Sequence, residues 1–169
     1  MPGFHNKQGY KYEGTVESVY RIDDMTIECV ADGIHVPPTI LRMAYKIKGV
    51  GRMALITDAL AVAAAPADAM AFDPRVIVED GVAKLNDRSA LAGSIATTDR
   101  LIRTAVNLAE IPLEDAVRMC SETPSLIMHV NDRKGTLQRG KDADILILDE
   151  KLDIRCIWQM GKIIENTLF

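Results

Sequence analysis

The segment Met53–Ala59, with the sequence Met-Ala-Leu-Ile-Thr-Asp-Ala, decides the fold of this 169-residue chain. Five of its seven residues are apolar, and so short a run predicts a strand buried on both faces. Asp58 follows directly where that strand ends. Because α/β folds build active sites at the C-terminal ends of parallel strands, Asp58 is the first candidate catalytic residue. Aspartate also caps turns and helices, so this segment alone leaves both roles open.

A second strand and a helix precede this segment. Residues 25–31 are β-prone and predict a buried strand that ends in the turn Asp32–His35. Paired prolines then open a helix that runs from residue 39 to residue 48 and stops at Gly49. Strand, helix and strand at this spacing predict a βαβ unit with parallel strands. Both strands therefore end on one side, where His35 and Asp58 could share a pocket, although a lone histidine in a loop is more often a turn or surface residue.

The remaining chain predicts smaller elements. Residues 75–85 indicate a β-hairpin that turns at Asp80-Gly81, and the alanine-rich residues 59–74 before it indicate a connection or lid. Leu91–Ser94 forms a small-residue turn, which either presents backbone amides of Gly93 and Ser94 to an anion or is only a tight connection. Further helices are expected over 98–109, 113–120 and 123–129, and strands over 144–149, 154–157 and 162–164.

The composition excludes several classes of protein. With 48% hydrophobic residues, 26% charged residues and a net charge of −4, the chain is typical of a soluble globular protein. It has no signal-peptide pattern and no apolar run near the roughly 18 residues that a membrane span needs. It also lacks the basic cluster of a nucleic-acid-binding protein. Three widely spaced cysteines predict reduced core residues of a cytoplasmic protein.

The predicted elements do not make a self-sufficient domain. Two parallel strands leave unpaired edges and an exposed apolar face. A complete (β/α)₈ barrel takes roughly 250 residues, so this chain cannot hold one together with its β tail. Either partner chains cover the exposed face or the chain is part of a longer protein.

Several motifs resemble those of a known family. They are ADGIHVPP (31–38), LITDAL (55–60), LAGS (91–94), EDAVRMCSETPS (114–125) and RKGTLQRGKDADILILD (133–149). In this order and spacing they resemble the N-acetylglucosamine-6-phosphate deacetylases of the metal-dependent amidohydrolase superfamily. The resemblance covers the whole chain but only the C-terminal half of a family member. It implies the last two βα units of a TIM-like (β/α)₈ barrel within residues 1–133, followed by the C-terminal part of a small β-sandwich in residues 134–169.

The resemblance also implies a reaction of amino-sugar metabolism. Family members hydrolyse the acetamide of N-acetylglucosamine 6-phosphate with a divalent metal, zinc or iron, that activates water. Asp58 matches the metal-proximal aspartate that takes the proton of this water and passes it to the leaving amine. Lys7 matches an arginine that reaches the substrate phosphate, and it keeps the charge but loses the bidentate fork. The other positions implied to contact the substrate are Asp32, Gly33, Ile34, His35, Leu91, Ala92, Gly93 and Ser94.

The departures from the family lead to two hypotheses. The family's metal-binding glutamate and histidines match positions upstream of this chain, so Asp58 is expected to hold no metal alone and the chain to be inactive. In the first hypothesis the chain is the C-terminal portion of a deacetylase. In the second it is a non-catalytic remnant that acts as an oligomeric or sugar-phosphate-binding module.

The expected partners are an amino-sugar phosphate and either further copies of the chain, in a homo-oligomer, or the missing N-terminal half. No nucleic acid or membrane partner is expected.

Overall fold

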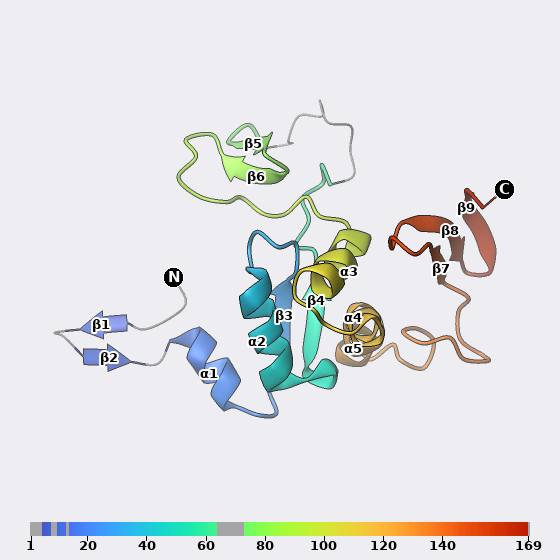
Figure 1. Ribbon diagram of the computed structural model, residues 1–169, viewed down its shortest axis with the longest axis horizontal. Helices are drawn as coiled ribbons and strands as arrows, with labels where there is room; N and C mark the ends of the chain where they lie inside the picture. Colours follow the sequence, from blue (N-terminus) through green and yellow to red (C-terminus); the bar gives the residue numbers. More distant parts are fainter. Residues whose placement is uncertain (1–4, 8–9, 13, 64–72, 169) are drawn as a thin grey trace.

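The predicted βαβ unit lies at the centre of the structure. The computed structural model describes residues 5–7, 10–12, 14–63 and 73–168 (Figure 1). The unit is formed by β3 (Ile27–Val30), α2 (Pro38–Lys48) and β4 (Met53–Ile56), with a short 3-10 helix, η1 (Val50–Arg52), before β4. The two strands pair in parallel, with Ile27 opposite Met53. The prediction of parallel strands joined by a helix is therefore confirmed.

Helices cover one face of the β3–β4 pair (Figure 1). They are α2, α3 (Thr98–Asn107) and α4 (Leu113–Cys120). The residues from Met53 to Leu55 are at most 4% exposed, as predicted for a buried strand. Apolar side chains of the strands and of the helices pack into one core cluster. Each large apolar side chain that folding buries there contributes roughly 1.5–3 kcal/mol to folding stability, so the cluster holds the strands to the helices. Its members include Ile27, Cys29, Leu41, Ala44, Met53, Leu55, Leu101, Ile102, Ala105, Ile111, Ala116 and Met119.

The predicted hairpin is also confirmed. It consists of β5 (Val76–Glu79) and β6 (Val82–Leu85), paired antiparallel. Asp80 and Gly81 form its turn with φ values of +54° and +73°, as a two-residue turn with the twist of a hairpin requires. Of the predicted connection or lid, the structure describes residues 59–63 and 73–74, and residues 64–72 lie outside the described residues.

The N-terminal part contains an additional hairpin. The sequence predicts a loop followed by either a short helix or an irregular segment near residues 14–20. The helix is present as α1 (Thr15–Arg21), but β1 (His5–Lys7) and β2 (Tyr10–Tyr12) pair before it. These six strand residues are mostly polar or aromatic and lack the alternation that marks a strand with one buried face.

Two helices end earlier than predicted. Helix α3 stops at Asn107 rather than residue 109, because the amides of Leu108 and Ala109 both donate to the Thr104 carbonyl at 3.1 and 3.0 Å. Helix α5 spans Glu122–Ile127 instead of 123–129. It cannot continue through His129, whose φ of +55° lies in the left-handed region.

The C-terminal residues form a three-stranded antiparallel sheet in the order β7-β8-β9. The prediction of an all-β tail is confirmed, but the prediction that the first of these strands is a buried run is wrong. Leu146 and Ile147 are 49% and 39% exposed, because the rest of the described chain leaves this part of the sheet uncovered. Ile163 and Ile164 are more exposed still, at 53% and 61%. The bounds are β7 (Ile145–Leu148), β8 (Ile154–Gln159) and β9 (Lys162–Asn166).

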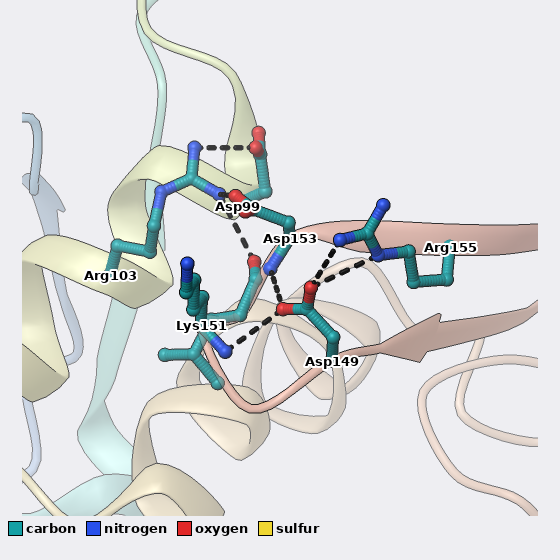
Figure 2. Close-up of polar contacts among 7 residues, drawn as sticks. Asp99, Arg103, Asp149, Lys151, Asp153 and Arg155 are labelled. Carbon is teal, nitrogen blue, oxygen red and sulfur yellow. Dashed lines mark hydrogen bonds and ion pairs between the residues drawn. The ribbon is translucent and has the colours of Figure 1, made fainter. Parts of the chain in front are cut away.

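The turn between β7 and β8 attaches this sheet to α3 (Figure 2). Leu152, at the centre of the turn, is 9% exposed and belongs to the core cluster. Arg103 of α3 donates to the Leu152 carbonyl at 3.0 Å, to Asp153 at 3.2 Å and to Asp99 at 2.6 Å. Asp149 closes the turn by accepting the Asp153 amide at 3.0 Å. One apolar side chain and one guanidinium therefore join the sheet to the helices.

We expect Arg103→Ala to destabilise this attachment by about 1–2 kcal/mol, because it removes charge-assisted hydrogen bonds from a half-buried turn. Urea unfolding measures the total effect, and amide exchange should rise most in β7–β9. Arg118→Ala is the matched control. The Arg118 side chain is more exposed than that of Arg103, and its ion-pair partner Glu122 is only four residues away. The loss of this pair should therefore destabilise the chain clearly less. Equal effects of the two substitutions would contradict the role given to Arg103.

All three cysteines are free. Cys29 in β3 and Cys156 in β8 are 8% and 2% exposed. Burial raises the pKa of Cys29 to about 11 and that of Cys120 to about 12, so these two are thiols at neutral pH. Within the described residues, no helix is long and apolar enough to cross a membrane.

Candidate active site

Asp58 lies two residues beyond β4 in an uncommon backbone conformation. Its φ is +48°, in the left-handed region that aspartate tolerates better than most residues. The residue is exposed, and its carboxylate forms no hydrogen bond or ion pair with the described part of the chain. Within that part of the chain it therefore caps neither a turn nor a helix. Unusual backbone conformations of this kind concentrate at functional sites.

The Leu91–Ser94 segment runs beside Asp58. The Ser94 amide donates to the Asp58 carbonyl at 3.0 Å, and the Leu60 amide donates to the Ser94 carbonyl at 2.8 Å. At Gly93, with a φ of +106°, a Cβ would lie 3.1 Å from two side-chain atoms of Leu60. Only glycine fits this close approach without strain.

One predicted role of this segment is wrong in part. The sequence suggests that the backbone amides of Gly93 and Ser94 could face an anion. The Ser94 amide is already used by the Asp58 carbonyl, and the Ser94 hydroxyl, which is fully buried, accepts the Ala96 amide at 2.8 Å. Ser94 therefore holds the segment to Asp58 and has no backbone donor left for an anion.

Asp32 and His35 form a second polar unit at the end of β3. Asp32 is 4% exposed, and its Oδ1 accepts the amides of Ile34 and His35, each at 2.9 Å. Its Oδ2 lies 2.8 Å from His35 Nδ1. Because a carboxylate accepts, Nδ1 carries the hydrogen, and Nε2 is the nitrogen left to face a ligand. The turn thus orients the imidazole, with Gly33 at a φ of +80°.

This hydrogen bonding sets the acidity of Asp32. Burial acts to raise its pKa, but the hydrogen bonds from the His35 ring and from the amides of Ile34 and His35 outweigh burial and lower the pKa below the ordinary 3.8. The carboxylate is therefore ionised at every pH at which an ordinary aspartate is ionised.

A pH dependence of folding stability follows. Since the pKa of Asp32 is lower in the folded than in the unfolded chain, its contribution is complete above about pH 5 and disappears as the pH falls below about 4. We expect Asp32→Asn to cost about 1–3 kcal/mol near neutral pH. The difference from the original chain should shrink as the pH falls below about 4. Urea unfolding across this pH series measures it, and a difference that does not change with pH would contradict the prediction.

The structure places the other predicted site residues as follows. Ile34, at the tip of the Asp32–His35 turn, is 37% exposed, and Lys7 lies opposite Tyr10 in the N-terminal hairpin. No hydrogen bond or ion pair among the described residues joins Asp58 to His35. Convergence of the two in one pocket remains a prediction. Of the predicted site residues, Ala92 lines a cavity of about 610 Å³ beside the β5–β6 hairpin. A cavity of about 430 Å³ on the C-terminal sheet is lined by none of them.

Sequence reasoning missed two residues of α3 near this region. Arg100 donates to the carbonyls of Asp32 at 3.2 Å and Gly81 at 3.3 Å. Thr104, 5% exposed, lies against Gly33, where a Cβ would come 3.3 Å from its Cγ2 atom. The available signal was their spacing of four residues, which puts both on one face of a helix.

The described residues do not fit a divalent metal by themselves. Zinc sites use three or four nitrogen, sulfur or carboxylate ligands. No group of three such side chains gathers anywhere in the part of the chain that the structure describes. Asp58 can supply one ligand at most.

Comparison with known proteins relates this geometry to a family. Residues 6–166 match the amidohydrolase family. An N-acetylglucosamine-6-phosphate deacetylase of Lysinibacillus sphaericus is 32% identical over 99% of this chain and 42% of its own length. The crystal structure of the deacetylase from Pasteurella multocida matches with a TM-score of 0.83 at 28% identity, over 97% of this chain and 44% of that one.

A further structure shows a ligand. It is a variant N-acetyl-D-glucosamine-6-phosphate deacetylase from Mycobacterium smegmatis in complex with N-acetyl-D-glucosamine-6-phosphate. It matches with a TM-score of 0.82 at 28% identity, over 91% of this chain and 41% of that one. The chain thus spans less than half the length of the relatives it matches. The match over nearly all of its residues shows that the chain belongs to the amidohydrolase family.

Proposed function

We propose that this chain is the C-terminal portion of a deacetylase that hydrolyses N-acetylglucosamine 6-phosphate to glucosamine 6-phosphate and acetate. The observation that carries the proposal is the placement of Asp58. Its carboxylate is exposed and makes no hydrogen bond or ion pair within the described chain, while its backbone is fixed by Ser94 in a left-handed conformation at the end of a buried parallel strand. A carboxylate held in this way is available to exchange a proton with a substrate.

The proposed reaction uses Asp58 as a proton carrier. Water attacks the acetyl carbonyl carbon, and Asp58 accepts the proton that the water loses. The bond between this carbon and the amide nitrogen then breaks, and Asp58 returns the proton to the leaving amine. Acetate and the free amino sugar result, and the carboxylate is restored. His35 is proposed to contact the sugar through Nε2, with Ile34 and Leu91–Ser94 lining the same site.

We propose that the 169 residues do not catalyse this reaction alone. The resemblance assigns the metal ligands of the family to a part of the family members that this chain does not match, and the described residues offer only Asp58 at the site. In the complete assembly, residues 1–133 would supply the last two βα units of a TIM-like barrel, and residues 134–169 part of a β-sandwich. We expect a cytoplasmic protein whose partner is the N-terminal half or a second copy of the chain.

A second candidate function is a sugar-phosphate-binding module without catalysis. The observation that favours it is the Asp32–His35 turn. In this turn the Asp32 carboxylate accepts hydrogen bonds from two backbone amides and from the His35 ring, and so orients the imidazole without any metal ligand. Such a turn could bind a hydroxyl or phosphate of a sugar even if hydrolysis were lost.

Complementation separates the two candidates. The chain is assayed for acetate release from N-acetylglucosamine 6-phosphate, alone and mixed with the part of the L. sphaericus deacetylase that it does not match. We expect no turnover alone, and turnover in the mixture that a chelator abolishes. Chelator-sensitive turnover by the isolated chain would refute the proposed inactivity. Binding without turnover in every mixture would favour the module, and sedimentation of the same samples would show which partner the chain takes.

A further inference from the structure

Arg100 joins three segments that lie far apart in the sequence. It projects from the first turn of α3, donates through one terminal nitrogen to the Gly81 carbonyl at 3.3 Å, and through the other to the Asp32 carbonyl at 3.2 Å. Gly81 is the turn of the β5–β6 hairpin, and Asp32 begins the turn that carries His35. One guanidinium therefore links the hairpin to the candidate sugar-binding turn.

The contact with the His35 turn has a second part. Thr104 lies one helical turn after Arg100, on the same face of α3, and packs against Gly33. A Cβ at Gly33 would meet the Thr104 methyl group at 3.3 Å, so the turn approaches the helix closely. Helix α3 therefore fixes the backbone of this turn at the adjacent residues Asp32 and Gly33.

The hairpin is in turn tied to Asp58. The Ala92 amide donates to the Ala83 carbonyl of β6 at 2.9 Å, and two residues later the Ser94 amide donates to the Asp58 carbonyl at 3.0 Å. Asp58 is thus connected to Gly81 through backbone alone. The connection uses these two hydrogen bonds, the chain from Ser94 to Ala92 and the chain from Ala83 to Gly81. The Arg100 guanidinium extends this connection to Asp32 and, through its carboxylate, to His35.

We propose that Arg100 is a positioning residue that sets the location of the Asp32–His35 turn relative to Asp58. The proposal rests on the proposed function, because it gives these two polar units a common substrate. Arginine suits this role since its rigid fork presents N–H groups on separate nitrogens to two carbonyls at once. Lysine carries the same charge on a single nitrogen and cannot reproduce the fork.

The test compares Arg100→Lys with the original chain, and Arg118→Lys serves as the control for replacing an arginine in an α-helix. Amide hydrogen exchange is followed residue by residue. We expect Arg100→Lys to speed exchange of the Ile34 and His35 amides and of the hairpin amides about tenfold. Exchange in β4 and α4 and the urea midpoint should stay unchanged. Arg118→Lys should leave the Ile34 and His35 amides as they were.

A second measurement uses N-acetylglucosamine 6-phosphate as the probe, with the complementing half present. We expect Arg100→Lys to raise KM about tenfold with little change in kcat, since the sugar contact is displaced while Asp58 is not. Unchanged exchange at Ile34 and His35 would overturn the proposal, as would a parallel rise at all amides, which indicates general destabilisation. If the mixture neither binds nor turns over the probe, the proposed function fails, and the exchange measurement still decides the role of Arg100.

Discussion

Gly135→Ala is expected to destabilise the folded chain by about 3 kcal/mol, which removes much of the stability of a typical domain. A Cβ at this position would lie 2.2 Å from Ser125 Oγ, 2.7 Å from Ser125 Cβ and 3.1 Å from the Ser121 carbonyl oxygen. Ser125 is 5% exposed and its hydroxyl donates to the Glu122 carbonyl, so it cannot move aside without breaking that hydrogen bond. The φ of +88° at Gly135 adds left-handed strain for alanine.

Gly140→Ala is the matched control for the backbone strain. Gly140 has a φ of +92°, but no atom lies within 4 Å of the position that a Cβ would take there, so we expect a cost of only about 1–2 kcal/mol. Both are measured by urea unfolding followed by far-ultraviolet circular dichroism. Combining Gly135→Ala with Ser125→Gly removes the two atoms nearest to the new Cβ. The double variant should therefore lose less stability than the sum of the losses of the two single variants. If Gly135→Ala and Gly140→Ala lowered the free energy of unfolding equally, steric overlap with Ser125 would be unimportant.

Asp58→Asn is expected to lower turnover of the complemented enzyme by about 10²–10⁴-fold, the usual contribution of a positioned acid–base group. The amide keeps the shape of the carboxylate and tolerates the left-handed backbone, but it cannot accept the proton of the attacking water. Folding stability should change little, because the Asp58 carboxylate forms no hydrogen bond or ion pair within the described residues. Acetate release and urea unfolding, measured on the same preparation, separate the two effects.

Asp23→Asn is the control for this substitution. Asp23 is also an exposed aspartate outside the regular elements, and its backbone carbonyl, rather than its carboxylate, accepts from Arg52. We expect full activity for this variant. Turnover of Asp58→Asn within about threefold of the original would exclude the proton-carrying role and leave Asp58 a positional residue.

The strongest local signals predicted the correct elements. These signals are local, so the sequence alone predicts the structure they form. The apolar run at Met53–Ile56 forms a strand, and positive φ values occur in the Asp80-Gly81 turn and at Gly49 after the helix. The Asp32–His35 hydrogen bonds also lie within four residues. The sequence suggested that this turn is functional, although it could not show that Asp32 orients the ring.

Features that depend on tertiary contacts were not predictable. The exposure of Leu146 and Ile147 depends on what covers the sheet, which an apolar run does not specify. Arg100 resembles an ordinary surface arginine until folding brings the carbonyls of Asp32 and Gly81 together, 68 and 19 residues away in the sequence. Whether the Asp58 carboxylate caps a turn or stays free likewise depends on which groups the fold places around it, and the sequence alone does not specify them.

The burial of the cysteines gives the chain internal probes of its own opening. Cys29 lies in the central parallel pair and Cys156 in the C-terminal sheet, both nearly inaccessible. A thiol reagent can therefore reach each sulfur only when its surroundings transiently unfold. The labelling rates of the two positions report separately on the two parts of the molecule. A partner that packs against the β3–β4 pair would slow labelling of Cys29, whereas one that covers the C-terminal sheet would slow labelling of Cys156.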